Sequence, residues 1–292
     1  MIRYSENYEY FIAVGLIILC TLSFSWADEK NDARKAMYHL RDGIGARAGG
    51  MGNSFVSVAN DASASYWNPA ELACLDNMNA QFTGMYAIPV PNSPYLFGAV
   101  VQRIKNDQGG IGVFWHNFMV GNLDSANREH VFGISYGRSL TPAFRVGMNV
   151  KYYYQMVNKS KFESFGFDMS ATIQPTGTLL KFSGNITDIG SLVTDPTGIA
   201  GISYPFIYNL LLLSVDVSRS IGQKYKPHMG IEITPFREIY IIDSISFRLG
   251  FDDFNYSVGL GIKLNKYNFD YSYINNQGTP SYTHRISITA FF

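Results

Sequence analysis

The sequence predicts an all-β protein: a transmembrane antiparallel β-barrel of about fourteen strands, with an N-terminal plug segment that contains short helices. Three observations lead to this prediction. Apolar and polar residues alternate with a period of two through most of the chain, and successive side chains of a strand point to opposite faces. Aromatic residues reach 15% while charged residues stay at 16%, which suits a barrel with a lipid-facing surface. An apolar stretch typical of secretion signals stands near the N-terminus.

The first expected element is a signal peptide over residues 1–27. Residues 11–24 form an apolar stretch that is shorter than the roughly 20 residues of a membrane-spanning helix. Ser25-Trp26-Ala27 then provides small residues at the −3 and −1 positions, so we expect cleavage after Ala27. Cleavage would leave Cys74 as the only cysteine, which argues against an internal disulfide and against a cysteine-based metal site.

Residues 28–76 are predicted to form a plug segment that precedes the barrel. Its glycine-rich stretch over 43–52 permits tight backbone bends. Further along, Asn68, Pro69 and Glu71 have the pattern of a helix start. Asn68 would be the N-cap, Pro69 the first helical residue, and Glu71 the reciprocal capping partner. We expect this helix to end near Leu75.

Residues 77–292 are predicted to form the barrel. The span from residue 78 allows about 15 residues for each strand and its connection, and a membrane strand needs roughly 9–11. The segment at 197–204 is the least regular, and loss of one pair of strands would give twelve. The expected strands lie at 78–87, 95–104, 109–118, 129–139, 143–156, 162–174, 178–187, 197–204, 208–218, 225–234, 239–250, 254–264, 266–275 and 282–292.

Charged residues recur on the strand face opposite the lipid-facing one, and they are predicted to face the lumen. One interpretation is a polar transport path. The interpretation that we favour is a set of ion pairs that satisfies buried charges and holds the plug. Mixed signs argue against a strongly ion-selective open pore. The residues concerned are Arg145, Lys151, Asp168, Asp216, Glu232, Arg248, Asp270 and Arg285.

Composition and motifs argue against several classes of function. Basic and acidic residues both total 23, whereas a nucleic-acid partner normally requires an excess of positive charge. The five histidines have no metal-ligand spacing. No Gly-x-Ser-x-Gly hydrolase motif occurs, and the glycine-rich stretch lacks the Lys-Ser/Thr of a phosphate-binding loop. We therefore predict no enzyme activity, no cofactor and no metal.

Residues 45–73 resemble a known family. They read Gly45-Ala-Arg-Ala-Gly-Gly-Met-Gly-Asn-Ser-Phe-Val-Ser-Val-Ala-Asn-Asp-Ala-Ser-Ala-Ser-Tyr-Trp-Asn-Pro-Ala-Glu-Leu-Ala73. This segment is similar to the start of the mature chain in PorV/PorQ-like outer-membrane proteins, which are related to the FadL-type long-chain fatty acid transporters. The chain departs from the usual pattern at Asn53, Asn60 and Glu71. The residues to which we assign a structural or gating role in the plug are Gly45, Arg47, Gly50, Gly52, Asp61, Trp67, Asn68 and Pro69.

The resemblance implies a barrel in the outer membrane of a Gram-negative bacterium, with the plug folded into the lumen. Two functions are consistent with it. The first is the binding or passage of small hydrophobic molecules, and the second is a role as a scaffold or partner in a type IX-like secretion system. A soluble secreted β-sandwich is the alternative outside this family. The expected partners are outer-membrane lipid, a hydrophobic small molecule and the barrel-assembly machinery.

Overall fold

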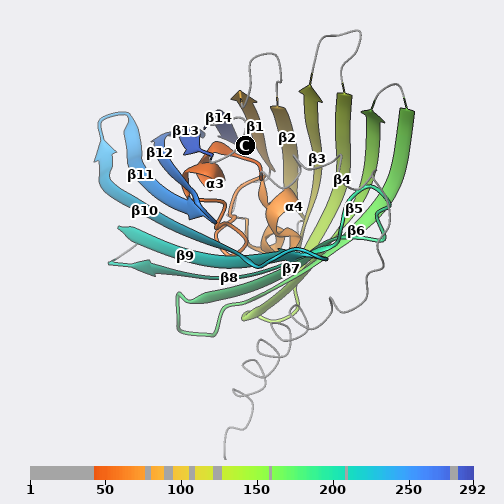
Figure 1. Ribbon diagram of the computed structural model, residues 1–292. Coiled ribbons are helices and arrows are strands. Elements are labelled where there is room, and N and C mark those ends of the chain that lie inside the picture. Colours follow the sequence, from red (N-terminus) through yellow and green to blue (C-terminus); the bar gives the residue numbers. More distant parts are fainter. Residues whose placement is uncertain are drawn as a thin grey trace, which may run out of the picture.

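The computed structural model describes residues 43–75, 80–88, 95–104, 109–120, 127–157, 160–207, 210–276 and 282–292. Within these residues, fourteen antiparallel strands close into one barrel, shown in Figure 1. Each strand pairs with its neighbours in sequence, and β1 (Ala80–Ile88) pairs with β14 (Tyr282–Phe291) to complete the ring. This confirms the predicted fourteen-strand barrel. The predicted signal peptide lies outside the described residues.

Each expected strand corresponds to an observed one, including the irregular segment at 197–204. The other strands are β2 (Tyr95–Ile104), β3 (Gly109–Val120), β4 (Asn127–Ser139), β5 (Phe144–Val157), β6 (Ser160–Ile173), β7 (Lys181–Ile189), β8 (Thr197–Phe206), β9 (Leu211–Ser220), β10 (Lys226–Ile239), β11 (Ile242–Asp252), β12 (Asn255–Leu264) and β13 (Tyr267–Asn275). Across the described residues, no helix combines the length and the apolar character that a bilayer crossing requires.

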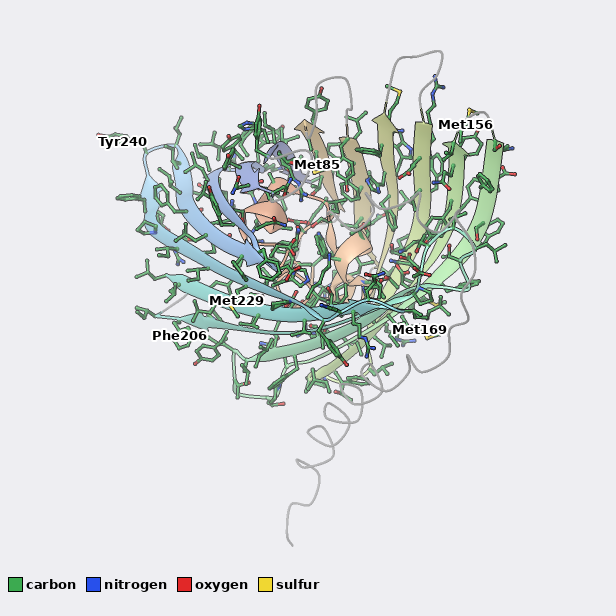
Figure 2. All side chains as sticks on the ribbon, in the orientation of Figure 1. Met85, Met156, Met169, Phe206, Met229 and Tyr240 are labelled. Atoms are coloured by element: carbon green, nitrogen blue, oxygen red, sulfur yellow. The ribbon has the colours of Figure 1, made fainter. Side chains whose placement is uncertain are left out.

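Side chains alternate between the lumen and the outer surface along the strands. In β5, Arg145 and Lys151 are buried inside the barrel, whereas Met148 and Val150 are exposed on the outside. The outer surface carries large apolar side chains on many strands, and Figure 2 shows Met169, Met229 and Phe206 among them. A surface of this kind is expected to meet lipid, because an exposed apolar belt surrounds membrane barrels.

The plug lies inside the barrel (Figure 1) and contains α3 (Ala46–Gly50), α4 (Ala64–Trp67) and the 3₁₀ helix η2 (Pro69–Cys74). As predicted, the Asn68 side chain accepts a hydrogen bond from the backbone N–H of Ala70, and Pro69 takes the first helical position. The predicted capping role of Glu71 is wrong. The backbone N–H of Asn68 bonds to the Ala64 carbonyl, and both carboxylate oxygens of Glu71 bind wall residues described below.

The connections divide between two ends of the barrel. We call the end where β1 begins and β14 ends the terminal end, and the opposite end the loop end. At the terminal end, Asn265 makes a tight turn between β12 and β13 with a positive φ of 50°. The long connection at 190–196, between β7 and β8, lies at the loop end.

Candidate functional site

Backbone-to-backbone contacts join the plug to strands β10–β12. Gly50 of α3 and Gly259 of β12 face each other so closely that a Cβ on Gly50 would lie 3.0 Å from the Gly259 Cα. Gly52 has a φ of +63°, and a Cβ there would meet the backbone of Phe251. A Cβ on Gly250 of β11 would meet the Gly52 nitrogen in turn. We call this contact the β10–β12 seam. The closest approaches in it involve backbone atoms, which leave no room for a side chain between plug and wall.

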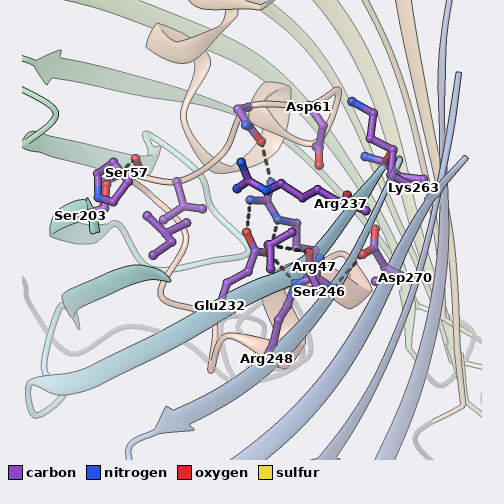
Figure 3. Close-up of a pocket in the computed structure, with 18 of the residues that line it drawn as sticks. Arg47, Ser57, Asp61, Ser203, Glu232, Arg237, Ser246, Arg248, Lys263 and Asp270 are labelled. Atoms are coloured by element: carbon purple, nitrogen blue, oxygen red, sulfur yellow. Dashed lines mark hydrogen bonds and ion pairs between the residues drawn. The ribbon is translucent and has the colours of Figure 1, made fainter. Parts of the chain in front are cut away.

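A network of charged side chains reinforces the β10–β12 seam (Figure 3). Arg47 of the plug donates two hydrogen bonds to Glu232, both of 2.9 Å, and a third of 2.6 Å to the Asn60 side chain. Arg248 contacts the same carboxylate at 2.6 Å and reaches Asp270 at 2.7 Å. Two arginines therefore share two carboxylates. Burial lowers the pKa of Arg47, but Glu232 more than offsets this and raises the pKa above its usual value.

A second network holds η2 against β5 and β7. Glu71 is 1% exposed and binds Arg145 through one oxygen at 2.8 Å and Lys181 through the other at 2.8 Å. Burial raises the pKa of this carboxyl, but Lys181 and Arg145 outweigh burial and hold the pKa below its usual value. The carboxylate is therefore ionised and paired with two wall cations, as a buried charge requires.

The remaining plug-motif residues fix the fold of the plug itself. Gly45 has a φ of +88° at the start of α3, and its N–H contacts the Met85 sulfur at 2.9 Å. The Trp67 indole N–H donates to the Ile44 carbonyl at 3.1 Å. Asp61 accepts a hydrogen bond from the Ser63 N–H at 2.8 Å. These contacts tie together turns that have little regular secondary structure.

Two further predicted lumen residues touch the plug directly. Asp216 of β9 accepts hydrogen bonds from the backbone N–H groups of Phe55 and Val56, at 2.7 and 2.9 Å. Arg285 of β14 lies 3.5 Å from the Asn53 side-chain oxygen. All eight predicted lumen residues are buried. Arg145, Asp216, Glu232 and Arg285 bind the plug.

Lys151 and Asp168 belong to a different arrangement, which we call the latch. Lys151 of β5 binds Asp168 of β6 at 2.9 Å and Asp188 of β7 at 2.7 Å. Asp188 also accepts a hydrogen bond from the Tyr153 hydroxyl and donates its own N–H to Asp168 at 2.8 Å. Its φ is +64°. Sequence reasoning placed Lys151 and Asp168 inside the barrel but did not identify Asp188 or Tyr153.

The latch stands where the barrel wall loses its regular strand pairing. β7 pairs with β6 only between Phe167 and Ile173, with a register shift beside Phe167. The β6 residues 160–166 pair with β5 alone. Residues 190–196, which we call the strap, cover this part of the wall: the Leu192 N–H donates to the Ser164 hydroxyl at 2.9 Å. We call this contact the β6–β7 seam.

Two neighbouring apolar residues of the strap differ in exposure. Leu192 is 69% exposed, whereas Val193 is 2% exposed and belongs to the same buried apolar cluster as Tyr153. Val193 therefore connects the strap to the apolar interior of the barrel.

Aromatic side chains of the plug and of strands β2 and β3 pack together inside the barrel. Tyr66 of the plug makes edge-to-face contacts with rings of β2 and β3. Its ring centroid lies 6.1 Å from that of Phe97 and 5.8 Å from that of Phe114. The Tyr95 ring packs on the His116 ring, with 4.6 Å between the two ring centroids. The Lys151 ammonium lies 5.9 Å from the Tyr66 ring and 6.0 Å from the Tyr153 ring, which joins the latch to these rings. We define the aromatic cluster as Tyr66, Trp67, Tyr95, Phe97, Phe114, His116 and Phe118.

Among the described residues, two cavities at opposite ends of the lumen stand out. A small one of about 50 Å³ at the loop end has a mixed lining: the apolar residues Ala87, Tyr95, Phe118 and Ile274, and the polar residues Asn53, Asp252, Asn255, Asn276, Thr283 and Arg285. A large one of about 650 Å³ at the terminal end has a mostly polar lining. Among the described residues, no group of three or more His, Cys, Asp or Glu side chains could hold a metal ion.

Comparison with known proteins finds likeness only at the level of structure. No family model and no curated protein sequence matches the chain. The monoaromatic hydrocarbon channel CymD is similar over 86% of this chain and 98% of its own, with a TM-score of 0.59 at 12% identity. The fold is that of a FadL-like outer-membrane barrel. A Pseudomonas aeruginosa FadL homologue is similar over 85% of this chain and 98% of its own, with a TM-score of 0.56 at 12% identity.

The Pseudomonas putida toluene transporter TodX is a third structure similar to this FadL-like barrel. It matches 85% of this chain and 96% of its own, with a TM-score of 0.55 at 9% identity. At these identities the likeness establishes the fold and says nothing about individual residues. These similar structures are channels and transporters rather than enzymes.

Proposed function

We propose that this FadL-like barrel passes small hydrophobic molecules from the loop end to the lipid-facing surface, through the aromatic cluster and past the strap. One observation carries the proposal: the buried apolar cluster that includes Tyr95 and Phe118 beside the loop-end cavity also includes Val193 of the strap, where β6 has no strand partner on that side. The plug blocks the straight path along the barrel axis, because backbone contacts fix it to β10–β12.

The chemistry of the aromatic cluster supports a small apolar substrate. Aromatic rings pack well against other rings and against aliphatic groups, and ligand sites are commonly lined by such side chains. The loop-end cavity of about 50 Å³ is smaller than the roughly 150 Å³ cavity that holds benzene. Passage therefore requires the rings to move apart. CymD is a monoaromatic hydrocarbon channel and TodX is a toluene transporter, which makes toluene a suitable first probe.

The same proposal includes the family and the location of the protein. The motif at 45–73 and the apolar N-terminal stretch support a PorV/PorQ-like protein of a Gram-negative bacterium. It would be exported by a signal peptide cleaved after Ala27 and inserted into the outer membrane by the barrel-assembly machinery. Mass spectrometry of the mature N-terminus tests the cleavage site, and cell fractionation tests the location.

A disulfide between β6 and the strap tests the route. A Cβ built on Gly166 would lie 3.4 Å from the Ser191 Cβ, close to the 3.5–4.5 Å typical of disulfides. We therefore design the pair Gly166→Cys and Ser191→Cys in a Cys74→Ser background. Uptake of radiolabelled toluene by cells that express the oxidised protein should fall to the level of cells without it. Reduction should restore uptake.

Crowding at Gly166 needs its own control, because a Cβ there would also approach the Tyr153 ring at 2.9 Å. The single Gly166→Cys variant carries that crowding without the cross-link, so it should retain uptake. Full uptake by the oxidised pair would show that molecules do not pass the strap. Absence of toluene uptake by the unmodified barrel, together with co-purification of a secretion component, would instead favour a scaffold role.

A further inference from the structure

The terminal end of the barrel contains the large cavity, which we call the terminal chamber. Its volume is about 650 Å³, within the range of small-molecule sites. Figure 3 shows its walls, which the plug and strands of the opposite walls supply together. Five cationic side chains and three carboxylates line it, with eight hydroxyl and amide side chains between them. This lining differs in kind from the aromatic cluster at the other end of the lumen.

The cations that line the terminal chamber differ in how they are paired. Deep in the chamber, Arg47 and Arg248 are neutralised by Glu232 and Asp270. Lys263 is different: among the residues that the structure describes it forms no ion pair, and its ammonium lies 5.8 Å from the Phe291 ring. A ligand that brings a negative charge to Lys263 would therefore not compete with a carboxylate of the protein.

Neighbouring strands present further donors beside Lys263. Arg237 of β10 pairs in register with Ser244 of β11, Ser244 pairs with Lys263 of β12, and Lys263 pairs with Asn268 of β13. All four side chains line the chamber. Adjacent strands lie about 4.8 Å apart, so these four residues form one row of cationic, hydroxyl and amide groups. A carboxylate or phosphate group accepts several hydrogen bonds at once, so one such group at Lys263 could also bond the side chain on a neighbouring strand.

The opposite wall offers an unused hydrogen-bonding group. Ser57 of the plug lines the chamber and is 0% exposed. Its hydroxyl has no hydrogen-bond partner among the described residues, and an unsatisfied buried hydroxyl is costly. Ser203 and Asp61 line the chamber as well. The Ser203 hydroxyl donates to the Ser57 carbonyl at 3.0 Å and one Asp61 oxygen accepts from the Ser63 N–H, so both can still accept a hydrogen bond from a ligand hydroxyl. A ligand that reached this wall would therefore need hydroxyls of its own.

We propose that the terminal chamber binds a small hydroxylated anion, such as a sugar acid or a sugar phosphate. Its carboxylate or phosphate lies at the row that includes Lys263, and its hydroxyls face Ser57 across the chamber. The proposal is independent of the hydrophobic route, because the chamber lies at the terminal end, away from the aromatic cluster and the strap.

Titration calorimetry of the purified barrel in a neutral polyoxyethylene detergent tests the proposal. The probes are galacturonate and glucose 6-phosphate, with galactose as the neutral counterpart and octanoate as the apolar acid. Saturable heat is expected with the two hydroxylated anions and not with galactose. Lys263→Gln should weaken their binding by up to about fivefold, the effect of one exposed charge pair. Lys266→Gln, an exposed lysine on the next turn outside the chamber, should change nothing.

A second variant tests the contribution of the wall that carries Ser57 separately from that of the wall that carries Lys263. Ser57→Ala should weaken galacturonate about threefold or more, the effect of one hydrogen bond, and leave the binding of inorganic phosphate unchanged. Three results would overturn the proposal: no saturable heat with either hydroxylated anion, equal losses in Lys263→Gln and Lys266→Gln, or tighter binding of octanoate than of galacturonate. The last result would assign the chamber to amphiphilic acids.

Discussion

The two seams of this barrel are closed by different kinds of contact. At the β10–β12 seam, the backbones of plug and wall touch at Gly50 and Gly259, and two arginines share two carboxylates beside them. At the β6–β7 seam, strand pairing ends at Phe167, and the closure depends on side chains such as Asp188. Backbone contacts cannot be exchanged by rotating a side chain. The first seam is therefore a fixed attachment, while the second is the one that would open under the proposed route.

The largest expected effect on stability comes from removing the negative charge of Glu232, which two arginines share at the β10–β12 seam. Glu232→Gln would leave Arg47 and Arg248 with too few carboxylates, and an uncompensated buried charge typically costs about 3–5 kcal/mol. We expect about 3 kcal/mol, since Asp270 still pairs with Arg248. The free energy of unfolding in denaturant, measured in detergent micelles, gives this value.

The exposed pair of Lys161 and Glu163 on the outside of the barrel provides the matched control. Glu163→Gln should change the free energy of unfolding very little, because solvent-exposed ion pairs contribute little. If Glu232→Gln were as mild as Glu163→Gln, the charged network would not hold the plug, and the backbone contacts alone would account for the fixed seam.

A methyl group placed between plug and wall should have the next largest effect. Gly250→Ala would force a Cβ into the backbone of Gly52, and such overpacking costs about 1–3 kcal/mol. Gly98→Ala is the control, because nothing lies within 4 Å of a Cβ at Gly98. That change should be neutral or stabilise by up to about 1 kcal/mol, since alanine is favoured over glycine within a strand. Equal free energies of unfolding for the two variants would show that the plug can shift to make room for a methyl group at the β10–β12 seam.

The barrel and most of the fixed seam follow from the sequence because their pattern is local. Alternation assigns each residue of a strand to one face without knowledge of the neighbouring strand. It therefore predicts all fourteen strands and the inner position of residues such as Arg248 and Asp270. Glu71 shows the limit of local reasoning. The capping pattern predicts a partner at Asn68, whereas the real partner Arg145 lies 74 residues away.

The β6–β7 seam could not be predicted in this way. The register shift beside Phe167 and the positive φ of Asp188 depend on which strand lies next to β7, and periodicity does not report that. The aromatic cluster was missed for another reason. In β2 the inner residues Tyr95 and Phe97 alternate with the apolar outer residues Leu96 and Val100. Since both faces are apolar there, alternation does not separate lumen from lipid.

The smallest effect on stability, and the sharpest test of the comparison, is expected at the latch. Asp188→Asn keeps a residue that tolerates positive φ, and Lys151 keeps Asp168 as a partner at 2.9 Å, so we expect a loss of at most about 1 kcal/mol. A loss of that size shifts an opening equilibrium by about fivefold, and toluene uptake should rise by up to that factor. Asp270→Asn is the matched control, since it also removes one of two carboxylates that share a cation, but at the fixed seam. It should leave uptake unchanged. Equal uptake in the two variants would mean that the β6–β7 seam opens no more readily than the rest of the wall.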